Sequence, residues 1–374
     1  MKFKSSLIFL LFFCFITKAQ VTNFKEKFEL PEKTKETSGL LFFNSKIITH
    51  NDSGDDANLY EIDSLSGNLL RTISISNATN VDWEDITEDE SYIYIGDIGN
   101  NNGNRTDLKI YKILKSDYIN NESITAEIIE YSYEDQVDFS SKPNNNNFDA
   151  EAIIVFENSL LVFTKNWVDF KTNVYKIPLN SGTHTAVKIS SADIEGLITG
   201  ASNLNGNLYL CGYDSSFIPF LVYISFNRPP GDDIFASGFE KESLQNKLEV
   251  GSQVEAITSF DTGRYYISRE SVNNQFANLP QKLFEFSDDR DFLLSVQENN
   301  SEHLTISPNP FKNSLHFKSE KKIKSLFFFN TLGSKLLKKF DTEKVENLDL
   351  AKGIYFVKII FEDKKSVTKK IIKL

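Results

Sequence analysis

The chain has 374 residues, of which 40% are hydrophobic and 13% aromatic, which is enough for one large core and one small core. Its net charge of −11 is divided unevenly: residues 304–374 hold 16 basic against 7 acidic side chains, and residues 21–303 hold 22 against 45. A strongly acidic main part attracts cations and repels nucleic acid and anionic membrane surfaces, so we expect no nucleic-acid partner. The split predicts two domains with different tasks.

Residues 1–19 have the pattern of a signal peptide. Lys2 and Lys4 give a positive start, residues 7–16 are apolar, and Ala19 is a small residue suited to cleavage. The apolar run is too short to span a bilayer, and no later stretch is long enough either. We therefore expect an exported chain with no transmembrane segment after cleavage; a buried strand or a membrane anchor is the alternative.

Residues 20–297 contain five copies of one pattern. The copies begin at Ser38, Glu84, Glu151, Thr199 and Glu255, at intervals of 46, 67, 48 and 56 residues. Each start is followed by short apolar and aromatic runs that polar turns separate, which predicts four antiparallel strands per copy. Four-stranded units at this period are typical of β-propeller blades. We predict an all-β fold with a five-bladed propeller, and an ordinary β-sandwich is the alternative.

Three details of the predicted propeller stay open. A sixth blade would fit between residues 117 and 149, where the interval is longest. Two segments compete to close the ring as the outer strand of the last blade, residues 23–30 and residues 292–296. Fourth strands are predicted at residues 70–75, 126–133, 185–189 and 246–250.

A polar linker, residues 298–303, precedes a different pattern in residues 304–374. This last segment contains about seven short apolar runs, which predict a small immunoglobulin-like β-sandwich. It carries Ser-Pro-Asn-Pro-Phe at residues 307–311, a turn at residues 330–333, the run LDLAKGIYFVK at residues 348–358, and a basic end.

These motifs make residues 304–374 resemble the type A C-terminal sorting domain of the Bacteroidetes type IX secretion system. The resemblance implies recognition by the type IX secretion machinery and passage across the outer membrane, usually with removal of the domain. The protein would then be secreted or exposed at the cell surface. An adhesive sandwich that stays attached is the alternative.

The propeller geometry gathers acidic side chains at one place. The first strand of each blade lines the central channel, so its start lies at the same mouth as the end of the antiparallel second strand. The carboxylates that we expect there as metal ligands are Asp52, Glu84, Asp97, Glu151 and Glu255. Oxygen ligands alone suit Ca²⁺, the cofactor that we expect, or Mg²⁺. The alternative is structural: the Glu carboxylates would accept hydrogen bonds from neighbouring blades, and the Asp- and Asn-rich loops would be turns.

The same mouth is predicted to hold basic and aromatic residues that bind a ligand: Trp83, Lys165, Trp167, Tyr213 and Arg269. Lys165 and Arg269 would relieve repulsion between the carboxylates, and either Trp could stack on a sugar or pack in the core. His50 also lies at this mouth. No nucleophile-elbow motif accompanies it, so a Ser-His-Asp triad is not supported.

The recurrent starts of the form Glu, then Ala or Gly, then Ile or Leu, together with the loop at residues 96–101, make the propeller resemble the SdiA-regulated and esterase-like phytase group. In some lactonase-type propellers a Glu at a blade start is a metal ligand, which the resemblance extends to Glu84, Glu151 or Glu255. Two functions stay open. One is binding of an extracellular ligand beside Ca²⁺, and the other is a Ca²⁺-dependent hydrolase of a phosphoester, lactone or glycan that uses a mouth carboxylate as base.

Overall fold

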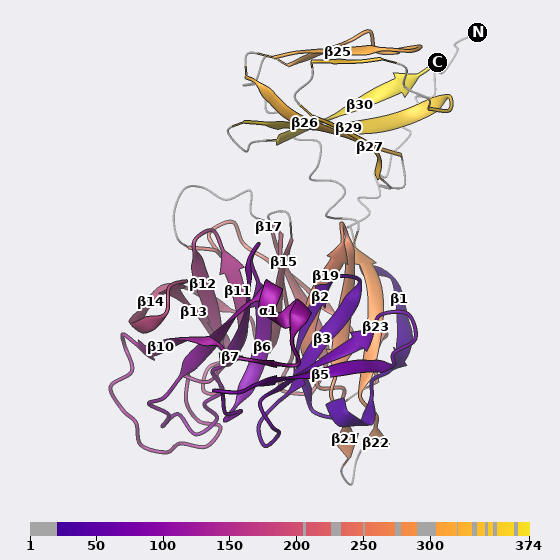
Figure 1. The fold of residues 1–374 in the computed structure, drawn as a ribbon. Helices are drawn as coiled ribbons and strands as arrows, with labels where there is room; N and C mark the ends of the chain where they lie inside the picture. The colour runs from indigo at the N-terminus through magenta and orange to yellow at the C-terminus, as the bar shows by residue number, and fades with distance from the viewer. Residues whose placement is uncertain are drawn as a thin grey trace, which may run out of the picture. The chain divides into compact units, whose positions relative to one another are not determined.

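The computed structural model describes residues 21–204, 207–225, 233–249, 251–273, 278–288, 290, 304–319, 321–330, 335–340, 343–346, 350–362 and 366–374. The predicted signal peptide, the predicted linker and residues 292–296 lie outside these residues. The chain forms two compact units, Met1–Asp289 and Arg290–Leu374, and both consist mainly of strands (Figure 1). No helix of the described part has the length and apolar character needed to cross a membrane.

Five strands of the first unit form a ring. In the described part of the chain each contacts the next in sequence order, and the last contacts the first. They are β2 (Thr37–Phe43), β6 (Trp83–Glu88), β11 (Ala150–Phe156), β15 (Leu197–Leu204) and β19 (Val254–Asp261). Each contains one of the predicted start residues, so the sequence repeat corresponds to a repeat in space and the unit is propeller-like.

Each ring strand begins a run of antiparallel strands that continues outward. From β2 follow β3 (Lys46–Asn51), β4 (Asn58–Asp63) and β5 (Leu69–Ile75); from β6 follow β7 (Tyr92–Asp97), β8 (Lys109–Leu114) and β10 (Glu127–Tyr133). From β11 follow β12 (Ser159–Thr164), β13 (Lys171–Pro178) and β14 (Gly182–Asp193); from β15 follow β16 (Asn207–Tyr213), β17 (Pro219–Ser225) and β18 (Glu240–Ser243). From β19 follow β20 (Arg264–Arg269) and β23 (Lys282–Asp288).

The core of this unit lies between neighbouring sheets. Side chains of one face pack against the next sheet, as Ile48 of β3 does with Trp83 and Ile95 of the following sheet. Further clusters join the second sheet to the third and the third to the fourth, and another joins the last sheet to the first. Burial on both faces explains why these strands are rich in Ile, Val and Tyr.

The N-terminal strand closes the ring. β1 (Val21–Glu29) pairs antiparallel with β23, which confirms the predicted role of residues 23–30. Phe24 stacks on Phe284 and Phe286, with ring centroids 5.7 and 6.0 Å away. Strands from the two ends of the first unit, more than 250 residues apart in the sequence, thus pair in one sheet.

Phe24→Ala is expected to lower the free energy of unfolding by about 2 kcal/mol, because it removes a half-buried ring that packs on two others. A drop of several degrees in the melting temperature of the whole chain would show this. The matched control is Phe139→Ala, since the Phe139 side chain is 41% exposed. Equal melting temperatures for both variants would contradict a closing role for β1.

Two predictions about outer strands need correction. Residues 117–149 form no sheet of their own: β9 (Ser123–Ile124) pairs in parallel with β5, and β10 lies between β8 and β14. The predicted strand at residues 246–250 is wrong over its described residues, because β18 takes that place at Glu240–Ser243. Leu244 and Leu248 are buried four residues apart in a turn, where the Leu248 N–H donates to the Leu244 carbonyl.

The second unit is a two-sheet sandwich. One sheet contains β24 (Thr305–Ser307), β25 (Leu315–Lys318) and β28 (Lys344–Val345). The other has the order β27 (Lys335–Phe340), β26 (Ile323–Phe329), β29 (Gly353–Phe361) and β30 (Ser366–Lys373). Buried residues alternate along β29, and Phe317 of one sheet packs edge-on against Phe328 of the other. This is the alternation that a sandwich core requires.

Candidate functional site

A polar cavity of about 210 Å³ lies where starts of ring strands and ends of second strands meet. We call it the acidic cavity. Its walls are Ser38, Asp52, Glu84, Asn101, Asn144, Glu151, Lys165, Trp167, Tyr213, Gln253, Glu255 and Glu270. The predicted convergence of the three Glu residues on one opening therefore holds in the structure: Glu84, Glu151 and Glu255 all line this cavity.

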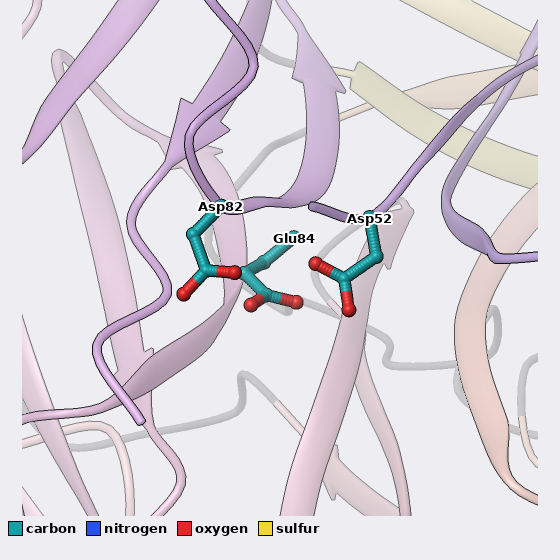
Figure 2. Close-up of side chains that lie close together, drawn as sticks. All are labelled: Asp52, Asp82 and Glu84. Carbon is teal, nitrogen blue, oxygen red and sulfur yellow. The ribbon is translucent and has the colours of Figure 1, made fainter. Parts of the chain in front are cut away.

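Three carboxylates form an acidic cluster at one side of the cavity. One oxygen each of Asp52, Asp82 and Glu84 lies within 4.8 Å of the others, and Figure 2 shows the three groups turned toward one another. Glu84 is only 3% exposed, and its buried Oε1 has no hydrogen-bond partner among the described residues. Hard oxygen ligands converging on a point are the donor set that Ca²⁺ and Mg²⁺ prefer, so the cluster could hold a divalent cation.

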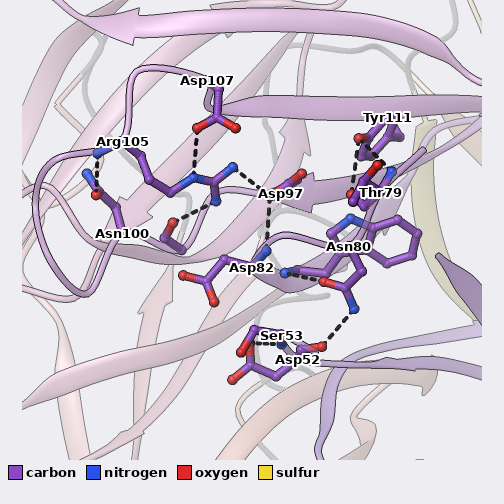
Figure 3. Close-up of polar contacts among 12 residues, drawn as sticks. Asp52, Ser53, Thr79, Asn80, Asp82, Asp97, Asn100, Arg105, Asp107 and Tyr111 are labelled. Carbon is purple, nitrogen blue, oxygen red and sulfur yellow. Dashed lines mark hydrogen bonds and ion pairs between the residues drawn. The ribbon is translucent and has the colours of Figure 1, made fainter. Parts of the chain in front are cut away.

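Backbone and amide hydrogen bonds hold the segments that carry Asp52 and Asp82 in place (Figure 3). The carbonyl of Asp82 accepts hydrogen bonds from the N–H groups of Ile98 and Gly99, both at 3.1 Å. The side-chain amide of Asn80 donates to the carbonyl of Asp52 at 2.7 Å. The segments that follow β3 and β7 are thereby tied to the start of β6, which fixes two of the three carboxylates before any ligand arrives.

Gly99 lets the loop after β7 pass close to the cluster. A Cβ atom at this position would lie 2.1 Å from Glu84 Oε1 and 2.4 Å from Asp82 Oδ2. Both distances are far shorter than van der Waals contact, so any other side chain must displace a carboxylate. The glycine is therefore required by space at the cluster.

Gly99→Ala is expected to weaken divalent-cation binding about tenfold or more. All three carboxylates remain, but the added methyl group displaces Glu84 or Asp82 from its position in the cluster. Calorimetric titration of the purified chain with CaCl₂ would measure the change in Kd. Ser53→Ala is the matched control, since Ser53 is exposed beside Asp52. An unchanged Kd for Gly99→Ala would mean that the cation does not bind at this cluster.

The lining of the acidic cavity also contains a buried ion pair. Lys165 Nζ lies 2.5 Å from Glu151 Oε1, and both side chains are almost fully buried. Lys165 also lies over the rings of Trp167 and Tyr213, 5.0 and 5.4 Å from their centroids. The indole N–H of Trp167 donates to Asp149 Oδ2 at 2.7 Å, which fixes the plane of the ring.

Burial and mutual repulsion shape the protonation of the cavity. Burial raises the pKa of Glu84 and of Glu255 well above the usual range, and neighbouring carboxylates raise both further. The same causes bring the pKa of Glu270 to about 7, and burial, partly offset by Lys165, brings that of Glu151 to about 8. Burial lowers the pKa of Lys165, but Glu151 and other acidic neighbours outweigh this, so the amine stays charged. A bound cation would favour the ionised carboxylates and release their protons.

The metal-free chain is expected to lose stability as pH rises from about 5 to 8. Glutamates in an unfolded chain titrate near about 4.3, so across this range the folded chain binds more protons than the unfolded chain, and its stability falls with pH. Melting temperatures after EDTA treatment would show the fall, and added CaCl₂ would raise the melting temperature more at the higher pH. Glu270→Gln should flatten the profile. A metal-free melting temperature that rises over this range would contradict the expected pKa shifts.

The structure brings most of the predicted site residues to the acidic cavity and leaves three elsewhere. Those in the cavity are Asp52, Glu84, Glu151, Lys165, Trp167, Tyr213 and Glu255. Trp83 is fully buried in the core, beside His50 and Tyr111. Arg269 is also buried and pairs with Glu249 at 2.5 Å. Neighbouring residues of a strand point to opposite sides, so Glu84 and Glu270 face the cavity while Trp83 and Arg269 face away from it.

Asp97 has a supporting position. Its Oδ1 accepts a hydrogen bond from Arg105 at 2.8 Å and another from the Asp82 N–H at 3.2 Å (Figure 3). Arg105 also donates to the Gly99 carbonyl at 2.8 Å. Asp97 therefore braces the loop behind the acidic cluster and does not line the cavity.

At the start of β6, a hydrogen bond to the neighbouring blade is made by Asp85, the residue next to Glu84. Asp85 accepts hydrogen bonds from the N–H groups of Ile153 in β11, at 2.9 Å, and of Ile86, at 2.8 Å. Sequence reasoning also left Asp82 and Glu270 out of the expected ligands. Their positions in the sequence could have indicated them, since Asp82 is two residues before Glu84 and Glu270 follows the end of β20. Asn101 belongs to the Asp- and Asn-rich loop after β7 that the sequence pointed to, whereas Asn144 and Gln253 come from loops that carried no such signal.

Comparison with known proteins identifies the second unit. Residues 305–374 match the family model described as a secretion system C-terminal sorting domain. This segment is a type IX sorting domain. The match confirms the predicted sorting domain and implies that the type IX machinery exports the chain to the cell surface or beyond. The resemblance of the first unit to the SdiA-regulated and esterase-like phytase group stays a prediction.

No curated protein matches the chain. Among solved structures, aldose sugar dehydrogenase from Streptomyces coelicolor in its PQQ-bound form has 10% identity and a TM-score of 0.42, over 72% of this chain and 99% of that one. A glucose dehydrogenase, described as a putative oxidoreductase, from Thermus thermophilus has 8% identity and a TM-score of 0.39, over 71% and 99%. The extracellular domain of a putative one-component system from B. thetaiotaomicron has 10% identity and a TM-score of 0.32, over 95% and 59%. These values assign neither a substrate nor a cofactor.

Proposed function

We propose that this protein is an exported five-bladed propeller that binds Ca²⁺ at Asp52, Asp82 and Glu84 and holds an extracellular ligand in the acidic cavity beside it. The observation that carries the proposal is the convergence of three carboxylate oxygens within 4.8 Å, one of them from Glu84, whose buried Oε1 has no partner among the described residues. An unpaired buried carboxylate oxygen is costly, and a cation would relieve that cost.

Calcium fits the cluster better than a transition metal. The three residues offer only carboxylate oxygens, whereas zinc and copper sites draw on imidazole or thiolate ligands. Ca²⁺ takes about six to eight oxygen ligands, more than three carboxylates supply in single contacts. The remaining positions would be filled by water or by groups of a bound ligand, which makes a cation at this wall a contact point for whatever enters the cavity.

Calcium binding is tested by titrating the EDTA-treated chain with CaCl₂ in a calorimeter. We expect one site per chain and a higher melting temperature once it is filled. A chain that takes up no Ca²⁺, or whose uptake survives the simultaneous replacement of Asp52, Asp82 and Glu84 by Asn, Asn and Gln, would overturn the proposal.

A Ca²⁺-dependent hydrolase is the second candidate, and one observation favours it. Glu270 lines the cavity with a pKa raised by burial to about 7, which suits a general base at neutral pH. The two functions separate in a screen of the Ca²⁺-loaded chain with nitrophenyl phosphates, nitrophenyl glycosides and simple lactones. Binding alone predicts no turnover. Turnover that Glu270→Gln abolishes, with Ca²⁺ affinity intact, would establish the hydrolase.

A further inference from the structure

The walls of the acidic cavity offer many more hydrogen-bond acceptors than free cationic groups. Besides the acidic cluster, Glu151, Glu255 and Glu270 face the cavity, and Asn101, Asn144 and Gln253 add amide groups that can both donate and accept. Lys165 is the one basic side chain among the described residues that line the cavity. A ligand that fits such walls needs several donors of its own.

Lys165 already forms an ion pair within the protein. Its Nζ pairs with Glu151 Oε1 at 2.5 Å, and Glu255 and Asp149 add attraction from further acidic groups. An incoming phosphate or carboxylate would have to break this pair or rely on the metal alone. It would also approach Glu255 and Glu270, whose ionised forms would repel it, because like charges in a buried site interact strongly. The side chains that line the cavity therefore disfavour an anionic ligand.

The lining of the acidic cavity also includes two aromatic rings next to the polar groups. Trp167 and Tyr213 both line the cavity, and the hydrogen bond from the Trp167 indole to Asp149 holds that ring in place. Aromatic rings beside carboxylates and amides suit a ligand that is apolar on the faces of a ring and rich in hydroxyl groups at its edge. The cavity volume of about 210 Å³ corresponds to roughly seven water molecules, which is room for one six-membered ring with its hydroxyls.

We propose that the ligand of the acidic cavity is a single neutral polyhydroxylated ring, a sugar or a cyclitol, and not an anion. Its hydroxyls would donate to the cavity carboxylates and complete the coordination of the cation, and its ring would lie against Trp167. This inference rests on the proposed Ca²⁺ site and names the class of ligand that the site selects.

The test compares ligands that share one ring and differ in charge. The full chain, saturated with CaCl₂, is titrated with D-galactose, D-glucose, D-mannose, D-xylose and myo-inositol, and with the anions D-galacturonate, D-glucuronate, galactose 6-phosphate and glucose 6-phosphate. We expect at least one neutral ring to bind at least about tenfold more tightly than the anion with the same ring, a difference of about 1.4 kcal/mol. Tighter binding of the anions, or binding of Ca²⁺ with no binding of any neutral ring, overturns the inference.

Variants locate the ligand and separate it from the cation. Trp167→Ala should weaken binding of the neutral ring at least about tenfold, a loss of about 1.4 kcal/mol, and leave the Kd for Ca²⁺ unchanged, because it removes the aromatic ring against which the ligand lies. Trp167→Phe keeps a ring at the site if the alanine variant fails to fold. Val168→Ala is the control, since this neighbouring side chain is 57% exposed. A chain that binds no Ca²⁺ overturns the proposed function itself, and the titrations therefore distinguish the two failures.

Discussion

Replacing Glu84 by Gln is expected to weaken Ca²⁺ binding at least about 100-fold, equivalent to about 2.7 kcal/mol. The change removes one of three carboxylate charges and can place an amide N–H₂ where an oxygen ligand is needed. The fold should survive, because Glu84 Oε1 has no hydrogen-bond partner in the described part of the chain and burial already opposes its ionisation. We expect the melting temperature of the metal-free chain to stay equal or to rise.

Two measurements on Glu84→Gln give this result: calorimetric titration with CaCl₂, and thermal unfolding with and without EDTA. Glu90→Gln is the matched control, because Glu90 is exposed beyond the other end of β6. If Glu84→Gln binds Ca²⁺ within about twofold of the unchanged chain, the acidic cluster is not the cation site. If it melts far below the unchanged chain, the role of Glu84 is structural.

Asp85→Ala is expected to have the opposite effect, a large loss of stability, with a decrease of about 3 kcal/mol in the free energy of unfolding. The side chain is fully buried, and its loss leaves the N–H groups of Ile153 and Ile86 without their acceptor. An unsatisfied buried donor costs about 1–3 kcal/mol, and here the lost bond to Ile153 also joins two ring strands.

Urea unfolding of Asp85→Ala, followed by tryptophan fluorescence, would measure this loss, and the Ca²⁺-saturated chain should show it too. Glu84→Gln serves as the comparison variant, because it changes the residue next to Asp85. A decrease below about 1 kcal/mol for Asp85→Ala would mean that the bond between β6 and β11 is not an important link.

The positions of the strands could be predicted from the sequence better than the side of the strand on which each side chain lies. Apolar and aromatic residues recur at the same place in each copy, so the ring strands and most outer strands could be located from pattern alone. Trp83 and Glu84 looked equally suited to the cavity, yet a strand sends them to opposite sides. The register that decides between them depends on pairing with distant residues, as Trp83 does with Asp97.

Long-range partners were beyond pattern reasoning. Arg105 donates hydrogen bonds to Asp97 and to the carbonyl of Gly99. Asp97, an expected metal ligand, therefore has a supporting role instead. Nothing in the sequence near Arg105 indicates this pairing. The parallel pairing of β10 with β14 joins two sheets into one of eight strands and likewise has no local signal. Closure by β1 was predictable because a ring needs a last strand and few segments remained.

Export fits the chemistry of the proposed cation site. A protein released beyond the outer membrane meets an environment in which extracellular Ca²⁺ modules work with dissociation constants of about 10⁻⁴–10⁻³ M. Three carboxylates that are held by hydrogen bonds but are costly to ionise together suit a site of that moderate strength. The carboxylates would then be ionised chiefly when the cation is bound.

An anomalous difference map from crystals of the chain grown with CaCl₂ would locate the bound cation. We expect one strong Ca²⁺ peak about 2.3–2.6 Å from carboxylate oxygens of Asp52, Asp82 and Glu84. A map without a peak at these three carboxylates, from crystals in Ca²⁺ well above its measured Kd, would contradict the proposed cation site.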